Sequence, residues 1–159
     1  GDIFENIPPE SESYAKILSK LKTDLGSFAV FGNHEYYRGL ANAKISFDNA
    51  NIKLLQNESI VLDNLNIIGI NDIKAGRITE EDFTKILVKQ VKSDKYNLLL
   101  SHTPLYFDLA ETNGVNLMLS GHTHRGQIWP FEYFTRITTP YVYGLYSINN
   151  AKIYEICDP

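Results

Sequence analysis

Apolar positions along the chain predict strands that alternate with helices. Short apolar runs, typical of buried strands, occur at 27–31, 52–55, 59–62, 65–70, 96–100, 115–119, 141–148 and 152–156. Helical spacing or helix-capping signals occur at 12–24, 41–50, 79–91 and 105–111. Because several strands are continuously apolar and polar motifs follow their C-terminal ends, we expect a layered α/β domain. A sheet of this kind is buried on both faces and collects its ligands at the carboxyl ends of its strands.

Two of the predicted helices carry specific signals. In the first, the spacing i, i+3, i+4, i+7 places four apolar side chains on one face of a helix: Tyr14, Ile17, Leu18 and Leu21. In the third, Thr79 precedes the acidic run 80–82, which is typical of an N-terminal cap with acids near the positive end of the helix dipole. That acidic run is therefore interpreted as a helix start. Asn71 and Asp72, after the strand at 65–70, are interpreted as a turn cap and not as metal ligands.

The histidines carry the strongest chemical signal. All four lie within a few residues after a predicted strand: His34, His102, His122 and His124. Any one of them could be an ordinary structural histidine, but that explanation would have to hold separately for three loops. Imidazole and carboxylate together suit Zn, Mn or Fe, and no cysteine lies nearby to form a thiolate zinc site. The sequence therefore predicts a metal site with nitrogen and oxygen ligands.

Four short motifs then occur in order: Gly1-Asp2-Ile3-Phe4-Glu5, Gly32-Asn33-His34-Glu35, Ser101-His102 and Gly121-His122-Thr123-His124. They resemble the G-D-x-x-D, G-N-H-[D/E], isolated-histidine and G-H-x-H blocks of calcineurin-like phosphoesterases. The last block alone would be weak evidence, but the ordered set spans almost the whole chain. The resemblance implies a single metallophosphoesterase domain over 1–159, with a layered αββα sandwich.

The resemblance also implies residue roles. Asp2 would bridge two metal ions; Asn33, His102 and His122 would complete the ligands of one ion, and His124 would bind the other. His34 would not be a ligand but would stabilise charge or protonate the leaving alcohol. Glu5 would orient His34, although the family usually has the shorter aspartate there.

Two divalent ions about 3.5–4 Å apart can polarise a phosphoryl group and supply a bridging hydroxide for in-line attack. The expected activity is therefore metal-dependent hydrolysis of phosphate mono- or diesters, with Mn, Fe or Zn as the cofactor. A hydrolase with two metal ions that acts on amides is disfavoured, because such sites rely on more carboxylates and the motif order matches phosphoesterases.

One block of the family pattern, D-x-H on the first strand, has no counterpart, since no histidine precedes His34. We therefore expect the chain to be the C-terminal portion of a longer protein, and to lack the first strand of the domain. One metal ion would be held well, by Asp2, Asn33, His102 and His122, and the second site would be weak or empty. Loss of a strand would expose a sheet edge and allow edge-mediated dimers. The alternative function is a catalytically inactive metal-binding or interaction fragment.

The segment that follows the G-H-x-H block adds a membrane hypothesis. Arg125-Gly126-Gln127-Ile128-Trp129-Pro130-Phe131 resembles the extension found in a bacterial branch of the family that is often membrane-associated and includes enzymes acting on lipid-linked phosphates. Arg125 could pair with substrate phosphate through its planar fork, or it could be an exposed arginine in a surface turn. The aromatic residues of 129–146 could contact lipid headgroups, but packing at the end of the sheet is the favoured interpretation.

Composition changes this picture little. Of 159 residues, 43% are hydrophobic and 21% charged, which excludes a disordered chain. The formal charge of -4 argues against non-specific binding to nucleic acid. The single cysteine, Cys157, cannot form an internal disulfide, and no apolar run is long enough for a membrane span. The expected location is the cytoplasm, or a membrane surface if an upstream anchor exists.

Overall fold

A six-stranded, mostly parallel sheet forms the larger half of the protein, for which the computed structural model describes residues 1–3, 10–123 and 141–156. In spatial order its strands are β3 (Glu58–Leu62), β4 (Leu65–Ile70), β5 (Tyr96–Ser101), β6 (Leu117–Ser120), β8 (Ala151–Glu155) and β7 (Gly144–Ile148). The four central strands are parallel, and the edge strands β3 and β7 pair antiparallel with their neighbours.

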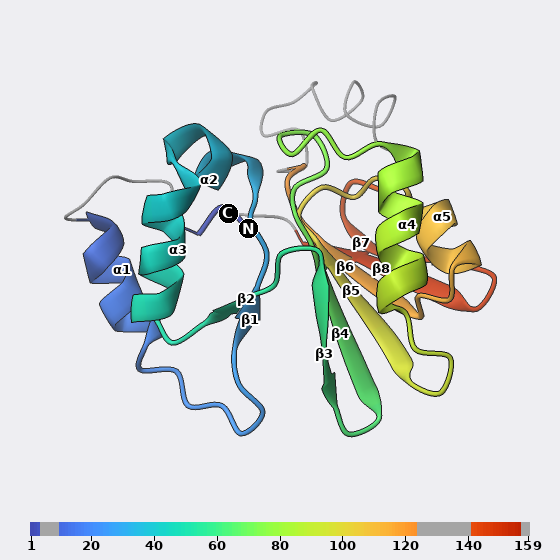
Figure 1. The fold of residues 1–159 in the computed structure, drawn as a ribbon, viewed down its shortest axis with the longest axis horizontal. Coiled ribbons are helices and arrows are strands. Elements are labelled where there is room, and N and C mark those ends of the chain that lie inside the picture. The colour runs from blue at the N-terminus through green and yellow to red at the C-terminus, as the bar shows by residue number, and fades with distance from the viewer. Residues whose placement is uncertain (4–9, 124–140, 157–159) are drawn as a thin grey trace.

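Two helices cover this sheet on the side away from the smaller half (Figure 1). They are α4 (Glu80–Gln90) and α5 (Phe107–Thr112). Phe83 and Leu87 of α4 are fully buried in one apolar cluster with Leu99 of β5 and Met118 of β6. Helix α4 begins as expected, because the Thr79 side chain accepts a hydrogen bond from the Asp82 backbone N–H.

The smaller half consists of a two-stranded parallel sheet and three helices, which lie beside the larger half in Figure 1. The strands are β1 (Phe28–Ala29) and β2 (Lys53–Leu54), and the helices are α1 (Glu10–Leu18), α2 (Asn33–Arg38) and α3 (Leu40–Asn49). Its own apolar cluster is built around Phe31 and Phe47. Helices, a short sheet, a long sheet and helices thus follow one another, and the predicted layered α/β class is confirmed.

The first helix is shorter than the predicted range 12–24, and most of its predicted apolar face is exposed. Helix α1 ends at Leu18, and Tyr14, Ile17 and Leu21 are 50%, 59% and 59% exposed. The small Ala15 is buried instead, with Leu18 packed against the same cluster. Helical spacing identifies side chains that share a face, but the partner helix α3 determines which face it covers.

Local signals placed the other elements well. The turn between β3 and β4 falls at Asp63, whose φ of 52° is the left-handed conformation typical of tight hairpin turns. Asp72 caps a turn, as predicted, since its Oδ1 accepts a hydrogen bond of 2.7 Å from the Ala75 backbone N–H. Helix α2 was not predicted, because its polar sequence lacks an apolar period.

The parallel strands bring two histidine loops to the same end of the large sheet, where the parallel strands have their C-terminal ends. Strands β5 and β6 are hydrogen-bonded neighbours, and their C-terminal ends lead directly to His102 and His122. The Gly121 backbone N–H donates a hydrogen bond of 3.0 Å to the His102 carbonyl, which ties the two loops together. This end of the sheet lies beside the part of the smaller half where Asn33 begins helix α2.

Candidate metal centre

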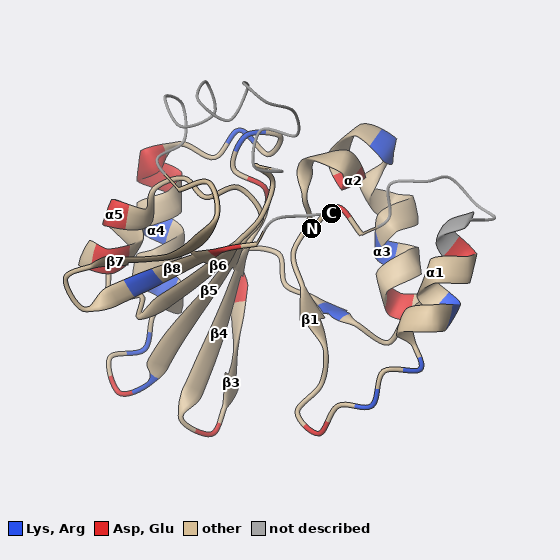
Figure 2. Ribbon diagram, turned by 180° about the vertical axis from the view of Figure 1, so that it is seen from behind, with Lys and Arg blue, Asp and Glu red and all other residues tan. Residues whose placement is uncertain are grey.

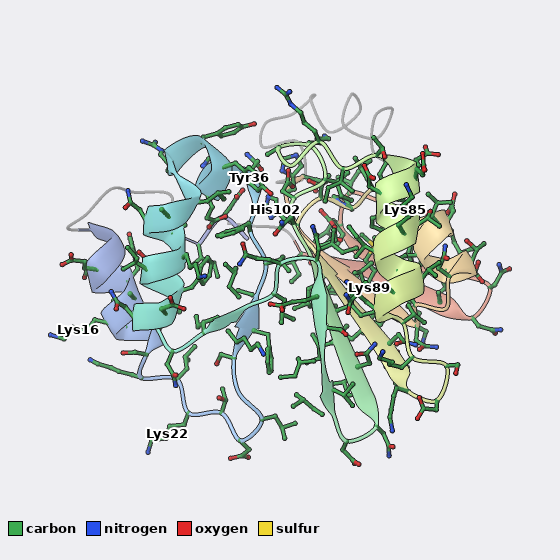
Figure 3. The ribbon with its side chains drawn as sticks, in the orientation of Figure 1. Lys16, Lys22, Tyr36, Lys85, Lys89 and His102 are labelled. Atoms are coloured by element: carbon green, nitrogen blue, oxygen red, sulfur yellow. The ribbon has the colours of Figure 1, made fainter. Side chains whose placement is uncertain are left out.

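Four polar side chains from four separate segments of the chain meet where the two halves of the fold touch. Asp2 and Asn33 come from the smaller half, and His102 and His122 from the large sheet. His102 lies between the two halves in Figure 3. Asn33 and His102 are buried, and Asp2 and His122 are half-buried. The structure therefore brings together the four side chains expected to hold the first metal ion, while their role as ligands stays a prediction.

The spacing of the four donor atoms fits a shared cation. Asn33 Oδ1 lies 2.8 Å from His122 Nδ1 and 3.1 Å from His102 Nε2. The two imidazole nitrogens are 3.2 Å apart, and Asp2 Oδ2 is 2.9 Å from His102 Nε2. Two donors bound at right angles to one ion, each at about 2.1 Å, would lie about 3.0 Å apart.

Asp2 supplies an independent indication that the donor set suits a cation. Its Oδ2 atom is buried and has no aligned hydrogen-bond donor, although His102 Nε2 is close to it. A buried carboxylate oxygen without such a donor is costly unless a positive charge balances it. Among the described residues, Asp2, His102 and His122 form the group of carboxylate and histidine side chains that could bind a metal ion.

Glu35 holds the Asp2 loop against the α2 loop. Its fully buried carboxylate accepts hydrogen bonds from the backbone N–H groups of Asp2 (2.9 Å), Ile3 (2.8 Å) and Gly32 (2.6 Å). Asp2 Oδ1 in turn accepts 2.9 Å from the His34 backbone N–H. This network keeps Asp2 at a φ of 58°, an unfavourable left-handed conformation for a non-glycine residue. The sequence motif contained Glu35, but this role was not predicted.

The pKa values of two of the four donors, Asp2 and His122, are lowered in the folded protein. Burial alone would raise the pKa of Asp2, but contact with the His102 imidazole and the His34 backbone N–H lowers it to about 2. Burial lowers the pKa of His122, and the neighbouring His102 and Lys74 lower it further. Asp2 is therefore an anion and His122 is neutral at pH 7, as metal ligands must be.

The other predicted site residues are placed only in part. His34 is half-buried beside Asn33, and its ring centroid is 6.2 Å from that of Tyr37. Glu5, His124 and Arg125 lie outside the described residues, as do Trp129 and Phe131 of the membrane hypothesis. The second metal site and the Glu5–His34 partnership thus stay predictions.

Positive charge approaches the centre from one further loop. The 71–79 segment between β4 and α4 carries Lys74 and Arg77, both exposed, and Figure 2 shows blue stretches in this loop on the side of the molecule that carries the site. The charge of Lys74 contributes to lowering the pKa of His122. Sequence reasoning did not identify this lysine, which no motif marks.

Two threonines were also missed. Thr103 directly follows His102 and Thr123 directly follows His122, and both threonines are buried. The Thr103 hydroxyl donates a hydrogen bond of 2.5 Å to Asp72 Oδ2, and the Thr123 hydroxyl lies 3.0 Å from Glu155 Oε1. The repeated His-Thr dipeptide is the sequence signal that could have revealed them.

Comparisons with known proteins agree with the geometry. A sequence model of the family described as calcineurin-like phosphoesterase matches residues 1–126. An uncharacterized metallophosphoesterase of Helicobacter pylori is 37% identical over 92% of this chain and 40% of its own length. One of Campylobacter jejuni is 32% identical over 97% of this chain and 42% of its own length. The chain thus spans about 40% of these curated relatives.

Two further matches concern the fold and the membrane. A crystal structure of a Staphylococcus aureus protein provisionally named a 5'-nucleotidase, with bound α-ketoglutarate, superposes with a TM-score of 0.61 over 91% of this chain and 34% of its own, at 11% identity. A Bos taurus protein named a transmembrane protein with metallophosphoesterase domain is 29% identical over 93% of this chain and 37% of its own length. Within the described part of this chain, no helix has the length and apolar character needed to cross a bilayer.

The order of the motifs, the convergence of four donor side chains and the match over residues 1–126 lead to one assignment. This chain belongs to the calcineurin-like phosphoesterase family.

Proposed function

We propose that this chain carries the metal centre of a metal-dependent phosphoesterase that hydrolyses phosphate mono- or diesters. The observation that supports this most directly is the convergence of Asp2, Asn33, His102 and His122, with neighbouring donor atoms 2.8 to 3.2 Å apart. The family supplies the reaction class, and the donors supply the place where it would occur.

The donor set favours a particular group of metals. Two imidazoles, one amide oxygen and one carboxylate suit Mn, Fe or Zn better than Mg or Ca, which prefer oxygen ligands alone. We propose that one such ion is held firmly by these four residues. A second ion would share Asp2 and use His124, with fewer ligands from this chain, and would therefore bind more weakly.

The work of the individual side chains follows from their positions. Divalent cations at this centre would supply Lewis-acid polarisation of the phosphoryl group and an activated water. His34 is held next to the centre by the hydrogen bond from its backbone N–H to Asp2, and its half-buried imidazole could donate a proton to the leaving oxygen. Lys74 and Arg125 are the cations that we propose to attract the phosphate anion.

For the complete protein, we propose a lipid-linked phosphate ester as the natural substrate and a location at a membrane. A lipid-linked phosphate ester is consistent with the Arg125–Phe131 extension, and a transmembrane relative supports membrane association of the complete protein. A membrane surface contact by Trp129 and Phe131 would follow. An edge-mediated dimer is a further possibility of assembly that the exposed edge of a sheet allows.

Hydrolysis of nitrophenyl phosphate and of bis(nitrophenyl) phosphate tests the activity. Protein stripped with a chelator is assayed before and after addition of Mn²⁺, alongside His34→Asn and the control Lys89→Gln, an exposed residue on α4 that is remote from the site (Figure 3). We expect activity that depends on Mn²⁺, is retained by Lys89→Gln, and falls by about 10²–10⁴-fold in His34→Asn, as for loss of a general acid.

The competing function, a catalytically inactive metal-binding module, predicts a different pattern. Mn²⁺ would bind to wild type and to both variants, yet neither ester would be hydrolysed. Hydrolysis of equal rate in chelator and in Mn²⁺ would contradict both proposals.

A further inference from the structure

The two histidine loops are fastened in the same way. In each loop the residue after the histidine is a buried threonine, and the threonine hydroxyl contacts a carboxylate whose residue is fully buried. Thr103 contacts Asp72, which lies in the loop after β4, and Thr123 contacts Glu155, which ends β8. Neither carboxylate belongs to the four donors of the proposed metal centre.

The first pair immobilises the His102 loop from two sides. Asp72 Oδ2 accepts 2.5 Å from the Thr103 hydroxyl, while its Oδ1 accepts 2.7 Å from the Ala75 backbone N–H. The Ser101 hydroxyl donates 2.9 Å to the Thr103 carbonyl. The residues on both sides of His102 are thus tied down, which leaves the imidazole little freedom of direction.

The second pair holds a loop that needs support. His122 has a φ of 78°, a left-handed conformation that a non-glycine residue keeps only when its surroundings impose it. The Thr123 hydroxyl has one hydrogen to donate and two acceptors beside it, the Val142 carbonyl at 2.8 Å and Glu155 Oε1 at 3.0 Å. Because Ser120 and Glu155 are paired in register across β6 and β8, the carboxylate is anchored in the sheet itself.

We propose that Asp72 and Glu155 are positioning residues that aim His102 and His122 through Thr103 and Thr123. The proposal rests on the cation site of the proposed function. Each threonine is the chain neighbour of its histidine, so a threonine whose hydroxyl is fixed in the core limits the directions that the imidazole beside it can take. Hydrogen-bonded partners behind metal ligands typically change metal affinity by 10–100-fold when removed.

The test compares Thr103→Val and Thr123→Val, which delete each hydroxyl at nearly constant volume, with Thr103→Ser and Thr123→Ser, which restore it. Thr112→Val, an exposed threonine that bonds only within its own helix, is the matched control. Mn²⁺ affinity is measured by calorimetry on chelator-stripped protein. We expect both valine variants to bind Mn²⁺ about 10–100-fold more weakly, the serine variants to recover most of that loss, and the control to be unchanged.

Asp72 also carries charge near the site, so its own substitution needs a double-mutant cycle. If Asp72 acts through Thr103, the losses of Asp72→Asn and Thr103→Val are not additive in the double variant; a purely electrostatic effect of Asp72 would add. If Thr103→Val is too unstable for calorimetry, Asp72→Asn alone should still weaken Mn²⁺ binding and shift the His102 imidazole resonances, since it keeps the volume and an acceptor for the Ala75 turn.

A second readout does not need a metal. Imidazole nitrogen and carbon resonances are recorded by NMR on the metal-free protein, where Thr103→Val should shift or broaden those of His102 and Thr123→Val those of His122. If wild type fails to bind Mn²⁺, the proposed function fails, and these spectra still decide the positioning role. Unchanged imidazole resonances, or valine variants that bind Mn²⁺ like wild type, would overturn it.

Discussion

Asp2 Oδ2 lies 2.9 Å from His102 Nε2, and the two side chains are 5% and 2% exposed. This contact joins the first loop of the chain to the end of β5 and therefore crosses from one half of the fold to the other. A carboxylate and an imidazole held this close and this deep suit a cation bound by both, because a carboxylate oxygen and an imidazole nitrogen can each serve as a ligand.

Asp2→Asn should weaken Mn²⁺ binding more than loss of an outer hydrogen-bond partner does, by at least about a hundredfold, since it removes the only anionic donor of the four. Asparagine tolerates the left-handed backbone at this position, so the fold should persist. Calorimetry measures the effect, and Asp63→Asn, in an exposed turn with a φ of 52°, is the control that should bind normally. Equal affinity of Asp2→Asn and wild type would remove Asp2 from the site.

Gly32→Ala should displace Asp2. A methyl group on Gly32 would overlap Asp2 Oδ1, which now accepts a hydrogen bond from the His34 backbone N–H. We expect the free energy of unfolding to fall by about 1–3 kcal/mol, the usual cost of overpacking, and Mn²⁺ affinity to fall as well.

Gly39→Ala is the control that separates a loss of stability from a loss of Mn²⁺ affinity. Nothing lies near a methyl group at Gly39, but its φ of 107° disfavours alanine. Urea unfolding should show a loss of stability in both glycine variants, whereas Mn²⁺ titration should show a loss only in Gly32→Ala. A normal Mn²⁺ affinity in Gly32→Ala would mean that Asp2 adapts without cost to the centre.

Acidification should destabilise the metal-free protein through His122. The pKa of His122 is lowered in the folded state, chiefly by burial, from an ordinary value of 6.5. At a pH between the pKa of His122 in the folded protein and its pKa in the unfolded chain, the unfolded chain binds a proton that the folded protein does not. The free energy of unfolding therefore falls as the pH drops below about 6.5. The slope from this residue is at most about 1.4 kcal/mol per pH unit.

Urea unfolding in chelator at pH 7.5, 6.5 and 5.5 measures this slope for wild type and for His122→Asn. Asparagine is compatible with the φ of 78° but does not titrate. The variant should therefore show a shallower fall in stability over this range. Identical slopes would show that His122 is protonated equally in both states.

Leu87→Ala tests the packing of α4 on the large sheet. Leu87 is fully buried among apolar side chains, so its truncation should cost about 2–5 kcal/mol in the free energy of unfolding. Its neighbour Val88 is 70% exposed, and Val88→Ala should change stability by less than about 0.5 kcal/mol. Similar losses in the two variants, measured by urea unfolding, would contradict the orientation of α4.

Local signals made much of the fold predictable, and non-local packing set the limit. The hairpin turn at Asp63 and the cap at Thr79 depend on neighbouring residues, so the sequence indicated both. The buried face of α1 depends on α3, a separate element, and the apolar spacing within α1 did not indicate it.

The candidate site divides in the same way. The positions of the histidines after strands, together with the family motifs, pointed to the four donor residues that the structure brings together. The contact between Thr123 and Glu155 joins residues far apart in the chain, and no local pattern announces it. The role of Asp72 was half recognised, because one of its oxygens makes a local turn and the other a distant contact.

The division of the donors between two separately packed halves has a mechanical consequence. A cation held by Asp2 and Asn33 on one side and by His102 and His122 on the other would also crosslink the two halves at their interface, in addition to its role in chemistry. Metal binding and the association of the two halves would then be linked equilibria. Substitutions that weaken the contact between the halves, even far from any donor, would consequently lower the measured metal affinity.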